Sequence, residues 1–543
     1  MKHRILTLLC IALCTQCLSA KEDTYFAIAK NLDLFNSIVK ELQLHYVDSI
    51  PVDKVVQAGI NGMLQKLDPY TNYISAETVK DFKYSTTGEY AGIGATIFLH
   101  GENVCISKVY EGTPAQKAGL QAGDLLLEID GKSMKGKKVE DASGMLRGTP
   151  GTKVRIKISR PGQKKSFTEE LIREHIHVSA IGYAGMLNGQ TAYIKLNSFT
   201  EDCSSEIKLT LKKLSAQGMQ SLILDLRGNP GGLLNEAVNI ANLFLPKGET
   251  IVTTRVKGNK VDRVYKTASN PEFPELPLVV LVNDETASAS EIVSGALQDL
   301  DRAVIVGERT YGKGLVQATY PLPYDGQLKV TTSKYYIPSG RCIQARVYDM
   351  ADSENESEIP DSLTSEFKTR HGRIVRDGRG ISPDVCVKSD TIPMIMYYII
   401  EHNLAFDYAT EYRLAHDSIA PIGQFDFNDF EYEKFKAYVL ASGHPYLSNS
   451  EKYLDELIDV AQYEKRYEAA ANEFEALRQA LHPDLSADLG NDSKYVKMYL
   501  SSEILERYYP QGAVAGTIPF DQVLQEAKKI LLDTKRYKEI LTK

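Results

Sequence analysis

The segment with the clearest chemical potential is residues 283–291, Asn-Asp-Glu-Thr-Ala-Ser-Ala-Ser-Glu, which lies between a predicted strand and a predicted helix. A serine at such a turn, here Ser288, is held at the C-terminal edge of a sheet, where α/β proteins place their sites. The next N–H groups, beginning with that of Ala289, are oriented donors that can stabilise an oxyanion. The alternative is a helix N-cap, because Glu291 follows Ser288 by three residues, as in a capping box.

A second segment, residues 312–317 (Gly-Lys-Gly-Leu-Val-Gln), holds a lysine between two glycines after a strand predicted to end at Gly307. Its spacing differs from that of a phosphate-binding P-loop, because Gly314 follows the lysine. Burial would drive the Lys313 amine towards its neutral form, in which it can act as a general base. Gln317 could then fix the orientation of that amine. The alternative is an ordinary turn lysine.

A third segment, residues 225–232 (Asp-Leu-Arg-Gly-Asn-Pro-Gly-Gly), is the end of a predicted strand followed by a glycine-rich turn. An N–H group of this turn, at Gly231 or Gly232, could form the other half of an oxyanion hole. The alternative is a glycine turn that only precedes a helix. The sequence leaves open which of the two glycines would serve.

These three segments belong to one region of alternating strands and helices, residues 178–384, and this alternation predicts α/β layers. Strands are expected at residues 192–196, 221–226, 278–282 and 303–307, and helices at residues 203–217 and 287–297. Helical periodicity also covers residues 25–76, with breaks at Pro51 and Pro69, and most of residues 391–543.

Residues 88–171 show a different pattern of short strands and turns, with a Gly-Ile-Gly loop at residues 92–94. The order of glycine loop, strand, Thr-Pro-Ala-Gln-Lys-Ala-Gly-Leu turn and Gly-Asp hairpin resembles a PDZ domain. The exposed strand edge of such a domain accepts an extended peptide, and the N–H groups of its loop, here at Gly92, Ile93 and Gly94, capture a terminal carboxylate. The alternative is that the two glycines only permit a tight turn.

Composition excludes several functional classes. The chain has 543 residues, of which 43% are hydrophobic and 25% are charged, as in ordinary globular proteins. Its 63 basic and 71 acidic residues give a net charge of −8, which disfavours generic binding to nucleic acid. Beyond the N-terminus no window approaches the ~18 uninterrupted apolar residues of a membrane span, which argues against a transporter or channel.

The N-terminus has the features of a secretory signal peptide. Basic residues 2–4 precede the apolar residues 5–13, and small residues 18–20 form a cleavage site. We therefore expect an exported protein, in the periplasm if the source is a bacterium with two membranes. The residues before Cys17 disfavour a lipoprotein anchor.

Taken together, the Pro-Gly-Gly turn, Thr-Ala-Ser-Ala-Ser-Glu and Gly-Lys-Gly-x-Val-Gln, downstream of a PDZ-like segment, resemble the C-terminal processing (tail-specific) peptidases, serine peptidase family S41. The resemblance covers residues 30–390, and the helical tail matches only loosely. In that family the nucleophile precedes the lysine by 25 positions and the glutamine follows it by four. Ser288, Lys313 and Gln317 have this spacing.

The resemblance implies that Ser288 is the nucleophile, Lys313 the general base and Gln317 the residue that orients it. It implies oxyanion donors at the N–H groups of Ala289 and of Gly231 or Gly232, and no metal or cofactor. A Ser-x-x-Lys pair at Ser205 and Lys208 matches penicillin-recognising enzymes, but the accompanying Lys-Thr-Gly is missing. A non-catalytic PDZ scaffold is the alternative function.

The expected architecture is multidomain α+β, with N-terminal helices, a PDZ-like β domain, a crotonase-like (ClpP-like) α/β protease core and a helical C-terminal domain. The expected boundaries are 1–20 for the signal peptide, 21–87 for the N-terminal helical segment, 88–171 for the PDZ domain, 172–390 for the protease core and 391–543 for the helical domain. The expected partners are proteins or peptides with exposed apolar C-termini, and a second copy or an adaptor bound through the helical ends.

Overall fold

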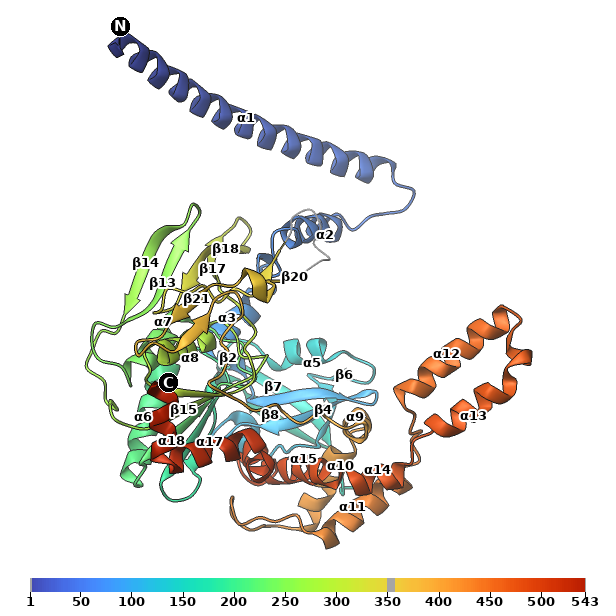
Figure 1. Cartoon of the computed structure of the whole chain (residues 1–543). Coiled ribbons are helices and arrows are strands. Elements are labelled where there is room, and N and C mark those ends of the chain that lie inside the picture. Colours follow the sequence, from blue (N-terminus) through green and yellow to red (C-terminus); the bar gives the residue numbers. More distant parts are fainter. Residues whose placement is uncertain (1, 349–356, 543) are drawn as a thin grey trace. The chain divides into compact units, whose positions relative to one another are not determined.

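The computed structural model describes residues 2–348 and 357–542, and the side chains of residues 24–79, 81–348 and 357–542 (Figure 1). The chain forms two compact units, and each is described by itself. The smaller unit consists of Met1–Ala76, Gln317–Thr331 and Tyr348–Ser357, and the larger of Glu77–Val316, Thr332–Val347 and Glu358–Lys543. Among the described residues, no helix combines the length and the hydropathy that crossing a membrane requires.

The smaller unit is built around two helices and a short antiparallel pairing. Its elements are α1 (Lys2–His45), α2 (Val52–Gln65), β1 (Asn72–Ile74) and the first part of β18 (Gln327–Tyr336). Pro51 directly precedes α2. This position suits proline, which disrupts the interior of a helix but is tolerated at its start. Asn72 pairs with Lys329 in the β1–β18 ladder. The predicted signal peptide lies in the part of α1 whose side chains are not described.

The PDZ-like region is a five-strand path with small helices, bounded by a pairing of β2 (Glu89–Gly92) with β9 (Glu174–His177). Alternation along β7 (Lys153–Ser159) buries Val154, Ile156 and Ile158, as expected for a strand with one face on a core. The path runs β3 (Ala95–His100), β4 (Asn103–Val109), β5 (Leu125–Ile129), β7 and β8 (Phe167–Ile172), with β6 (Lys132–Ser133) beside β5 and with α3 (Val79–Thr87), α4 (Pro114–Lys117) and α5 (Val139–Leu146) around it. β3 is therefore an edge strand.

A six-stranded sheet forms the centre of the larger unit, and it is parallel except for its first pair. Its strand order is β10 (Ile181–Met186), β11 (Thr191–Leu196), β12 (Ser221–Asp225), β15 (Leu278–Val282), β16 (Val304–Gly307) and β23 (Val385–Cys386). Every residue of β12, β15 and β16 is buried. Continuous apolar strands of this kind require cover on both faces of the sheet.

Helices from opposite ends of the chain supply that cover. One face packs against α6 (Cys203–Ala216), α7 (Leu234–Asn242) and α8 (Ala289–Asp299). The other face packs against α16 (Gly512–Thr517), α17 (Gln522–Leu532) and α18 (Thr534–Thr542), and Figure 1 shows α17 and α18 in red. The sequence places these last helices in a separate helical region, whereas the structure uses them as the second layer on the six-stranded sheet.

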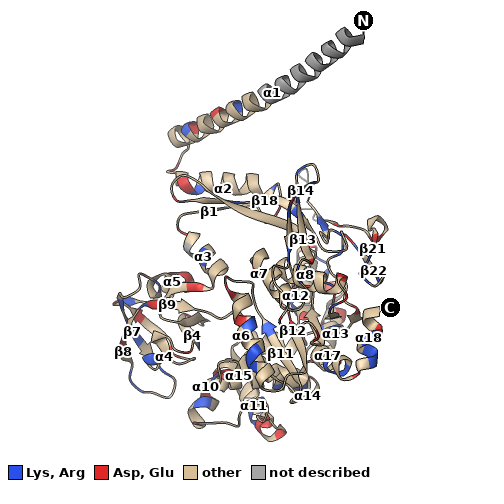
Figure 2. Cartoon of the chain, turned by 90° about the vertical axis from the view of Figure 1, so that its left-hand side faces the viewer, with Lys and Arg blue, Asp and Glu red and all other residues tan. Residues whose placement is uncertain are grey.

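The remaining C-terminal helices have a core of their own, in which Ile399, Phe435 and Leu500 are fully buried. They are α9 (Met394–Glu401), α10 (Leu404–Ala415), α11 (Asp429–Ala441), α14 (Leu485–Asn491) and α15 (Ser493–Glu506), with α12 (Asn449–Tyr463) and α13 (Ala471–Leu481) as a projecting hairpin (Figure 1). The other strands are β13 (Thr250–Val256), β14 (Lys260–Lys266), β17 (Leu315–Pro321), β19 (Arg346–Val347), β20 (Ser357–Glu358), β21 (Glu366–Lys368) and β22 (Ile374–Arg376). Acidic and basic residues are mixed over strands and helices alike (Figure 2).

Candidate active site

Ser288 occupies a strained turn between β15 and α8. Its backbone angles are φ 57° and ψ −116°, a conformation that residues with a side chain rarely adopt. The residue is half-buried and directly precedes the first residue of the helix. Strain of this kind at a strand-to-helix turn is also how nucleophile elbows expose a serine hydroxyl.

The carboxylate of Glu291 holds this turn from within. The Ser288 N–H donates to Glu291 Oε2 at 2.8 Å, and the Glu291 N–H donates to the backbone oxygen of Ser288 at 2.9 Å. The Glu291 side chain therefore caps the start of the helix as in a capping box. This cap is the alternative that the sequence offers to a catalytic role of Ser288. The cap does not exclude a catalytic serine, because the Glu291 carboxylate accepts from the Ser288 backbone N–H and not from its hydroxyl.

The same carboxylate holds the lysine loop. Glu291 Oε2 also accepts the Lys313 N–H at 2.9 Å, while Oε1 accepts the Gly312 N–H at 2.8 Å and the Thr310 hydroxyl at 2.5 Å. Glu291 is fully buried, and its four donors satisfy both oxygens. One side chain thus joins the serine turn to the lysine loop, although 25 residues separate Ser288 and Lys313.

A tyrosine forms a second bridge between the two segments. The Tyr335 hydroxyl lies 2.5 Å from the backbone oxygen of Lys313 and 3.2 Å from that of Ser288. The Tyr335 N–H also donates to the backbone oxygen of Gly314 at 2.9 Å. The backbone of the half-buried Lys313 is therefore fixed on both sides, by Glu291 at its N–H and by Tyr335 at its carbonyl.

Burial changes the acidity of the bridging carboxylate. Removal from water raises the pKa of Glu291 from its ordinary value of 4.5 to about 7, against the hydrogen bonds from Thr310, Ser288, Lys313 and Gly312, which lower it. Perturbed carboxyl groups of this kind concentrate at functional sites.

Gly231 lies directly against the serine turn. A Cβ atom at this position would fall 2.7 Å from the Ser288 Cβ and 2.8 Å from the Ala289 nitrogen, and its φ of +100° also requires glycine. Gly232 instead packs on Phe199, whose backbone oxygen would lie 2.3 Å from a Cβ at 232. A side chain at Gly231 would fill the space in front of the Ala289 N–H.

Two backbone N–H groups at this point are suited to an oxyanion. The Gly231 N–H donates to Asn229 Oδ1 at 2.9 Å and is thereby engaged. The N–H groups of Ala289 and Gly232 have no acceptor among the residues that the structure describes. Donors of this kind can stabilise the negative oxygen of a tetrahedral intermediate. Of the two glycines that the sequence left open, this favours the N–H of Gly232.

Hydrogen bonds fasten the glycine-rich turn to the serine turn. The Asn229 backbone oxygen accepts from the Ala287 N–H at 3.1 Å and from the Ser290 hydroxyl at 3.0 Å. The Thr286 hydroxyl donates to the Leu226 backbone oxygen at 2.9 Å. The two turns form one hydrogen-bonded assembly at the carboxyl ends of β12 and β15.

Gln317 and the other predicted site residues fall in different compact units. Gln317 belongs to the smaller unit, where its amide donates to the Thr331 hydroxyl at 3.1 Å. Ser288, Lys313, Ala289, Gly231 and Gly232 all lie in the larger unit.

The Gly-Ile-Gly loop connects β2 to the edge strand β3. Gly94 has a φ of +82°, and a Cβ there would collide with the Thr113 side chain at 2.3 Å. The loop carbonyls point inward, because the Ile93 oxygen accepts from the Ala115 N–H at 2.8 Å and the Gly94 oxygen accepts from the Tyr110 N–H at 3.0 Å. The edge strand β3 directly follows this loop, and a free strand edge is what peptide addition requires.

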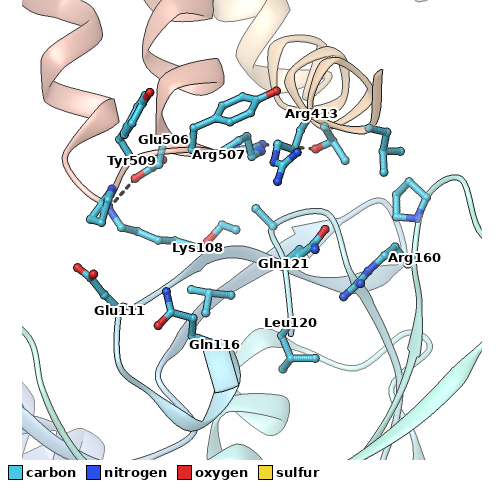
Figure 3. Close-up of a pocket in the computed structure, with 18 residues that line it drawn as sticks. Lys108, Glu111, Gln116, Leu120, Gln121, Arg160, Arg413, Glu506, Arg507 and Tyr509 are labelled. Atoms are coloured by element: carbon cyan, nitrogen blue, oxygen red, sulfur yellow. Dashed lines mark hydrogen bonds and ion pairs between the residues drawn. The ribbon is translucent and has the colours of Figure 1, made fainter. Parts of the chain in front are cut away.

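A separate cavity of about 210 Å³ lies between the PDZ-like region and helices α10 and α15 (Figure 3). Figure 3 shows Lys108, Arg160 and Arg413 around it, and Lys108 pairs with Glu506 at 2.6 Å across one end. None of the predicted site residues lines this cavity. Among the side chains that the structure describes, no group of three or more His, Cys, Asp or Glu residues is arranged to hold a metal ion.

Sequence reasoning missed the residues that connect the segments. The sequence indicates Glu291 only as a possible capping partner and Asn229 only as part of a turn, and it assigns no role to Tyr335. The sequence does contain a signal for Glu291, because an acidic side chain on the apolar side of a buried helix requires hydrogen-bond donors around it. Tyr335 is 1% exposed and carried no such signal. The rival pair Ser205 and Lys208 lies on α6, where Lys208 forms an ion pair with Glu272.

Comparison with known families agrees with this architecture. The family profile described as "Peptidase family S41" matches residues 190–350, and the PDZ domain profile matches residues 105–160. A third profile, "Probable PDZ-protease, C-terminal helical domain", matches residues 395–531. The three matches follow one another along the chain in the order that the fold shows.

Individual relatives are similar over more than half of the chain. The "Carboxy-terminal-processing protease" of Bartonella bacilliformis is 39% identical over 329 residues, which are 60% of this chain and 74% of that protein. The "Probable CtpA-like serine protease" of Staphylococcus aureus is 34% identical over 318 residues, 58% of this chain and 63% of that protein. A solved structure, the "photosystem II D1 C-terminal processing protease", covers 66% of this chain and 94% of its own, with 26% identity and a TM-score of 0.36.

An α/β core with a serine turn and a lysine loop, joined to a PDZ domain and a helical C-terminal domain, is the architecture of a PDZ-containing serine peptidase. With the relative from Bartonella, this settles the family. The chain belongs to peptidase family S41, the C-terminal processing peptidases, and is a serine peptidase. The predicted family and the predicted multidomain α+β fold are both confirmed.

Proposed function

We propose that this chain is an exported endopeptidase in which Ser288 attacks the peptide bond, Lys313 acts as general base and Gln317 orients the lysine. The observation that carries the proposal is the shared acceptor, because Ser288 and Lys313 donate their backbone N–H groups to the same oxygen of Glu291. This contact holds the nucleophile and the base segments in one rigid assembly. Ser–Lys pairs are a known variant of triad chemistry.

In the proposed mechanism, a neutral Lys313 Nζ takes the proton of the Ser288 hydroxyl as Oγ attacks the scissile carbonyl carbon. The N–H groups of Ala289 and Gly232 receive the developing oxyanion. The lysine then gives its proton to the leaving amine as the C–N bond breaks and the acyl-enzyme forms. A water molecule, deprotonated by the same amine, attacks the ester carbon. Ser288 leaves with that proton as the acid product is released.

Substrate selection is assigned to the PDZ domain. An extended C-terminal segment adds to the free edge of β3, and the N–H groups of Gly92, Ile93 and Gly94 receive its terminal carboxylate. β3 lies at the end of its strand path, which supports this assignment. The substrates are proteins or peptides with apolar C-termini, which the enzyme processes or degrades.

Export is proposed from the sequence, through the signal peptide of residues 1–20 with its basic start, apolar run and small-residue cleavage site. The compartment beyond the inner membrane, the periplasm in a bacterium with two membranes, is then the place of action.

A second copy of the chain is proposed as the partner of the N-terminal helix. The apolar residues Ile28, Leu32, Phe35, Val39 and Leu42 alternate at spacings of four and three, the heptad pattern of a coiled coil. Leu32 is 65% exposed and Phe35 44% exposed in the single chain. Light scattering after gel filtration should show a dimer of the mature protein, and the variant Leu32→Lys/Phe35→Lys should be monomeric. A monomeric wild type would refute the pairing.

The function is tested with an unfolded reporter protein that ends in an apolar tail. Wild type should cleave it, while Ser288→Ala and Lys313→Ala should each lose cleavage by a factor of about 10⁴ or more with the fold retained. The pH dependence of kcat/KM should show a base with an apparent pKa below the ~10.4 of a free lysine. Cleavage by Ser288→Ala would refute the proposal, and tight binding of the tail without any turnover by wild type would favour a scaffold.

A further inference from the structure

Arg227 connects the six-stranded sheet to the C-terminal helices. It lies in the segment 226–232, here called the oxyanion loop, two residues after the last buried residue of β12, Asp225. Its Nε and Nη2 donate to the two oxygens of Asp225 at 3.0 and 2.6 Å. Its Nη1 and Nη2 donate to the two oxygens of Asp521 at 3.0 and 2.6 Å. The planar guanidinium therefore forms a two-bond contact with a carboxylate on each side.

The Asp225 side of this contact is fixed by the sheet. Asp225 is fully buried, accepts the Tyr193 hydroxyl at 2.7 Å and lies 3.7 Å from the Lys195 amine. That amine donates to the backbone oxygen of Arg227 at 3.1 Å. Burial alone would raise the pKa of Asp225, but the charges of Arg227 and Lys195 hold it below its usual range, so the carboxylate stays ionised.

The Asp521 side is fixed by the second layer of the core. Asp521 is the N-cap of α17, and its Oδ1 accepts the Leu524 N–H at 2.9 Å. Val523, Leu524, Ala527 and Ile530 of that helix are buried against the sheet. The carboxylate thus sits on an element that cannot shift without opening the core.

The charge of Asp521 also decides whether Arg227 can stay in place. The guanidinium lies at the N-terminus of α17, the positive end of the helix dipole, which repels a cation. Its side chain is only 17% exposed, so water compensates little of this repulsion. Without the Asp521 charge, the arginine would keep only its Asp225 partner and would lose its charged anchor on the helix side of the oxyanion loop. The same loop carries Gly231 and Gly232.

We propose that Asp521 is a positioning residue for peptide hydrolysis: through Arg227, it holds the oxyanion loop at the geometry that presents a backbone N–H to the reaction intermediate. This inference rests on the proposed function of Ser288 and the oxyanion donors. It makes the C-terminal helical segment a part of the catalytic apparatus, and it provides a route by which a partner bound to those helices would change the rate of cleavage.

The test compares Asp521→Asn with Asp533→Asn in the full chain. Asp533 caps the next helix through the Arg536 N–H at 3.0 Å, so both variants lose one N-cap charge, but only Asp521 contacts the oxyanion loop. Asparagine retains the capping oxygen in each case. With the reporter protein as substrate, kcat should fall about tenfold or more for Asp521→Asn, with KM unchanged, because small displacements of catalytic groups cost rates of this size. The Asp533→Asn variant should match wild type.

A tetrahedral inhibitor distinguishes positioning from a merely structural role. The inhibition constant of a peptide boronate should rise for Asp521→Asn by the same factor by which kcat falls, while the affinity of a peptide product stays constant. Equal losses of boronate and product affinity, or a wild-type kcat, would overturn the proposal.

The variant Arg227→Lys tests the same link if Asp521→Asn does not fold, because a lysine ammonium cannot form a two-bond contact with each of two carboxylates. It should show the same loss of kcat, and the double variant should lose no more than the worse single variant. A wild-type kcat in Arg227→Lys, or full additivity, would overturn the inference. Absence of serine-dependent cleavage by wild type would instead overturn the proposed function, so the two failures are distinguishable.

Discussion

Ser288 and Lys313 donate their backbone N–H groups to a single carboxylate oxygen, Oε2 of Glu291, at 2.8 and 2.9 Å. The two segments follow different strands of the six-stranded sheet, and the buried side chain of Glu291 joins their backbones. This leaves both side chains out of that contact. The group that positions the two segments is therefore different from the groups proposed to react. Substitutions at the glycine and glutamate positions can then test the backbone geometry of the site.

Gly231→Ala should strongly reduce cleavage, because the new methyl group would press on the Ser288 Cβ and the Ala289 nitrogen at 2.7–2.8 Å. It would fill the space in which the oxyanion is proposed to lie. We expect kcat to fall by about 10² or more, the loss seen when an oxyanion donor is removed. Steady-state cleavage of the reporter protein measures this.

The control is Gly228→Ala in the same loop. Gly228 also has a positive φ, +69° against +100° at Gly231, but a Cβ there meets only the Glu285 carboxylate at 3.5 Å. This variant should keep most of the wild-type rate. If both variants lose the rate equally, the effect comes from loop strain and not from the oxyanion space.

Ser288→Gly should be more stable than Ser288→Ala, although both are inactive. The alanine keeps a side chain at φ 57°, a strain of about 1–3 kcal/mol, whereas glycine relieves it at an entropic cost of about 0.4–1 kcal/mol. The net gain in the free energy of unfolding should be about 1 kcal/mol, measured by denaturant titration. At Ser294, inside α8, the same pair of substitutions should give the opposite order, with glycine about 1 kcal/mol less stable.

Glu291→Gln should remove a pH dependence of stability. The folded-state pKa of Glu291, about 7, lies above its ordinary 4.5, so the folded protein binds this proton more tightly than the unfolded chain. The resulting stabilisation is complete below about pH 4.5 and is lost as the pH rises through about 7, a change of the order of 3 kcal/mol. The difference between the wild-type and variant unfolding free energies across this range measures it.

The exposed neighbour Glu285 supplies the control for this measurement. Glu285→Gln changes the net charge by the same amount in the same turn, and it should leave the wild-type pH profile unchanged. A Glu291→Gln profile that runs parallel to wild type between pH 4.5 and 7 would show that the buried carboxyl group does not titrate in this range.

The sequence predicted those parts of the fold that depend on local patterns. The apolar runs of β12 and β15 and the serine turn between β15 and α8 lie where periodicity and turn chemistry place them, because these signals are contained within a few residues. The packing of α17 on the same sheet could not be predicted, because its apolar stripe is compatible with any partner surface.

The same limit applies to the site. The types and spacing of Ser288 and Lys313 were readable, but the partners that fix them come from distant segments. Tyr335 and Asp521 reach the site only through the fold, and neither residue type is unusual in a strand or at a helix start. Buried hydrogen-bond networks of this kind depend on three-dimensional proximity, about which a single sequence is silent.

The PDZ loop gives the last prediction. In the inactive Ser288→Ala chain, a peptide with a free C-terminal carboxylate should bind more tightly than its C-terminal amide by about tenfold or more, because charge-assisted hydrogen bonds to N–H groups are lost in the amide. Gly94→Ala should remove this preference, since a Cβ there collides with Thr113 at 2.3 Å and must displace the loop. Gly101→Ala, in the turn between β3 and β4, also has a positive φ but no atom within 4 Å of its Cβ, and it should retain the preference. Fluorescence anisotropy of labelled peptides measures all six affinities, two peptides for each of the three chains. Equal binding of carboxylate and amide peptides by the parent chain would mean that Gly92, Ile93 and Gly94 form only a tight turn.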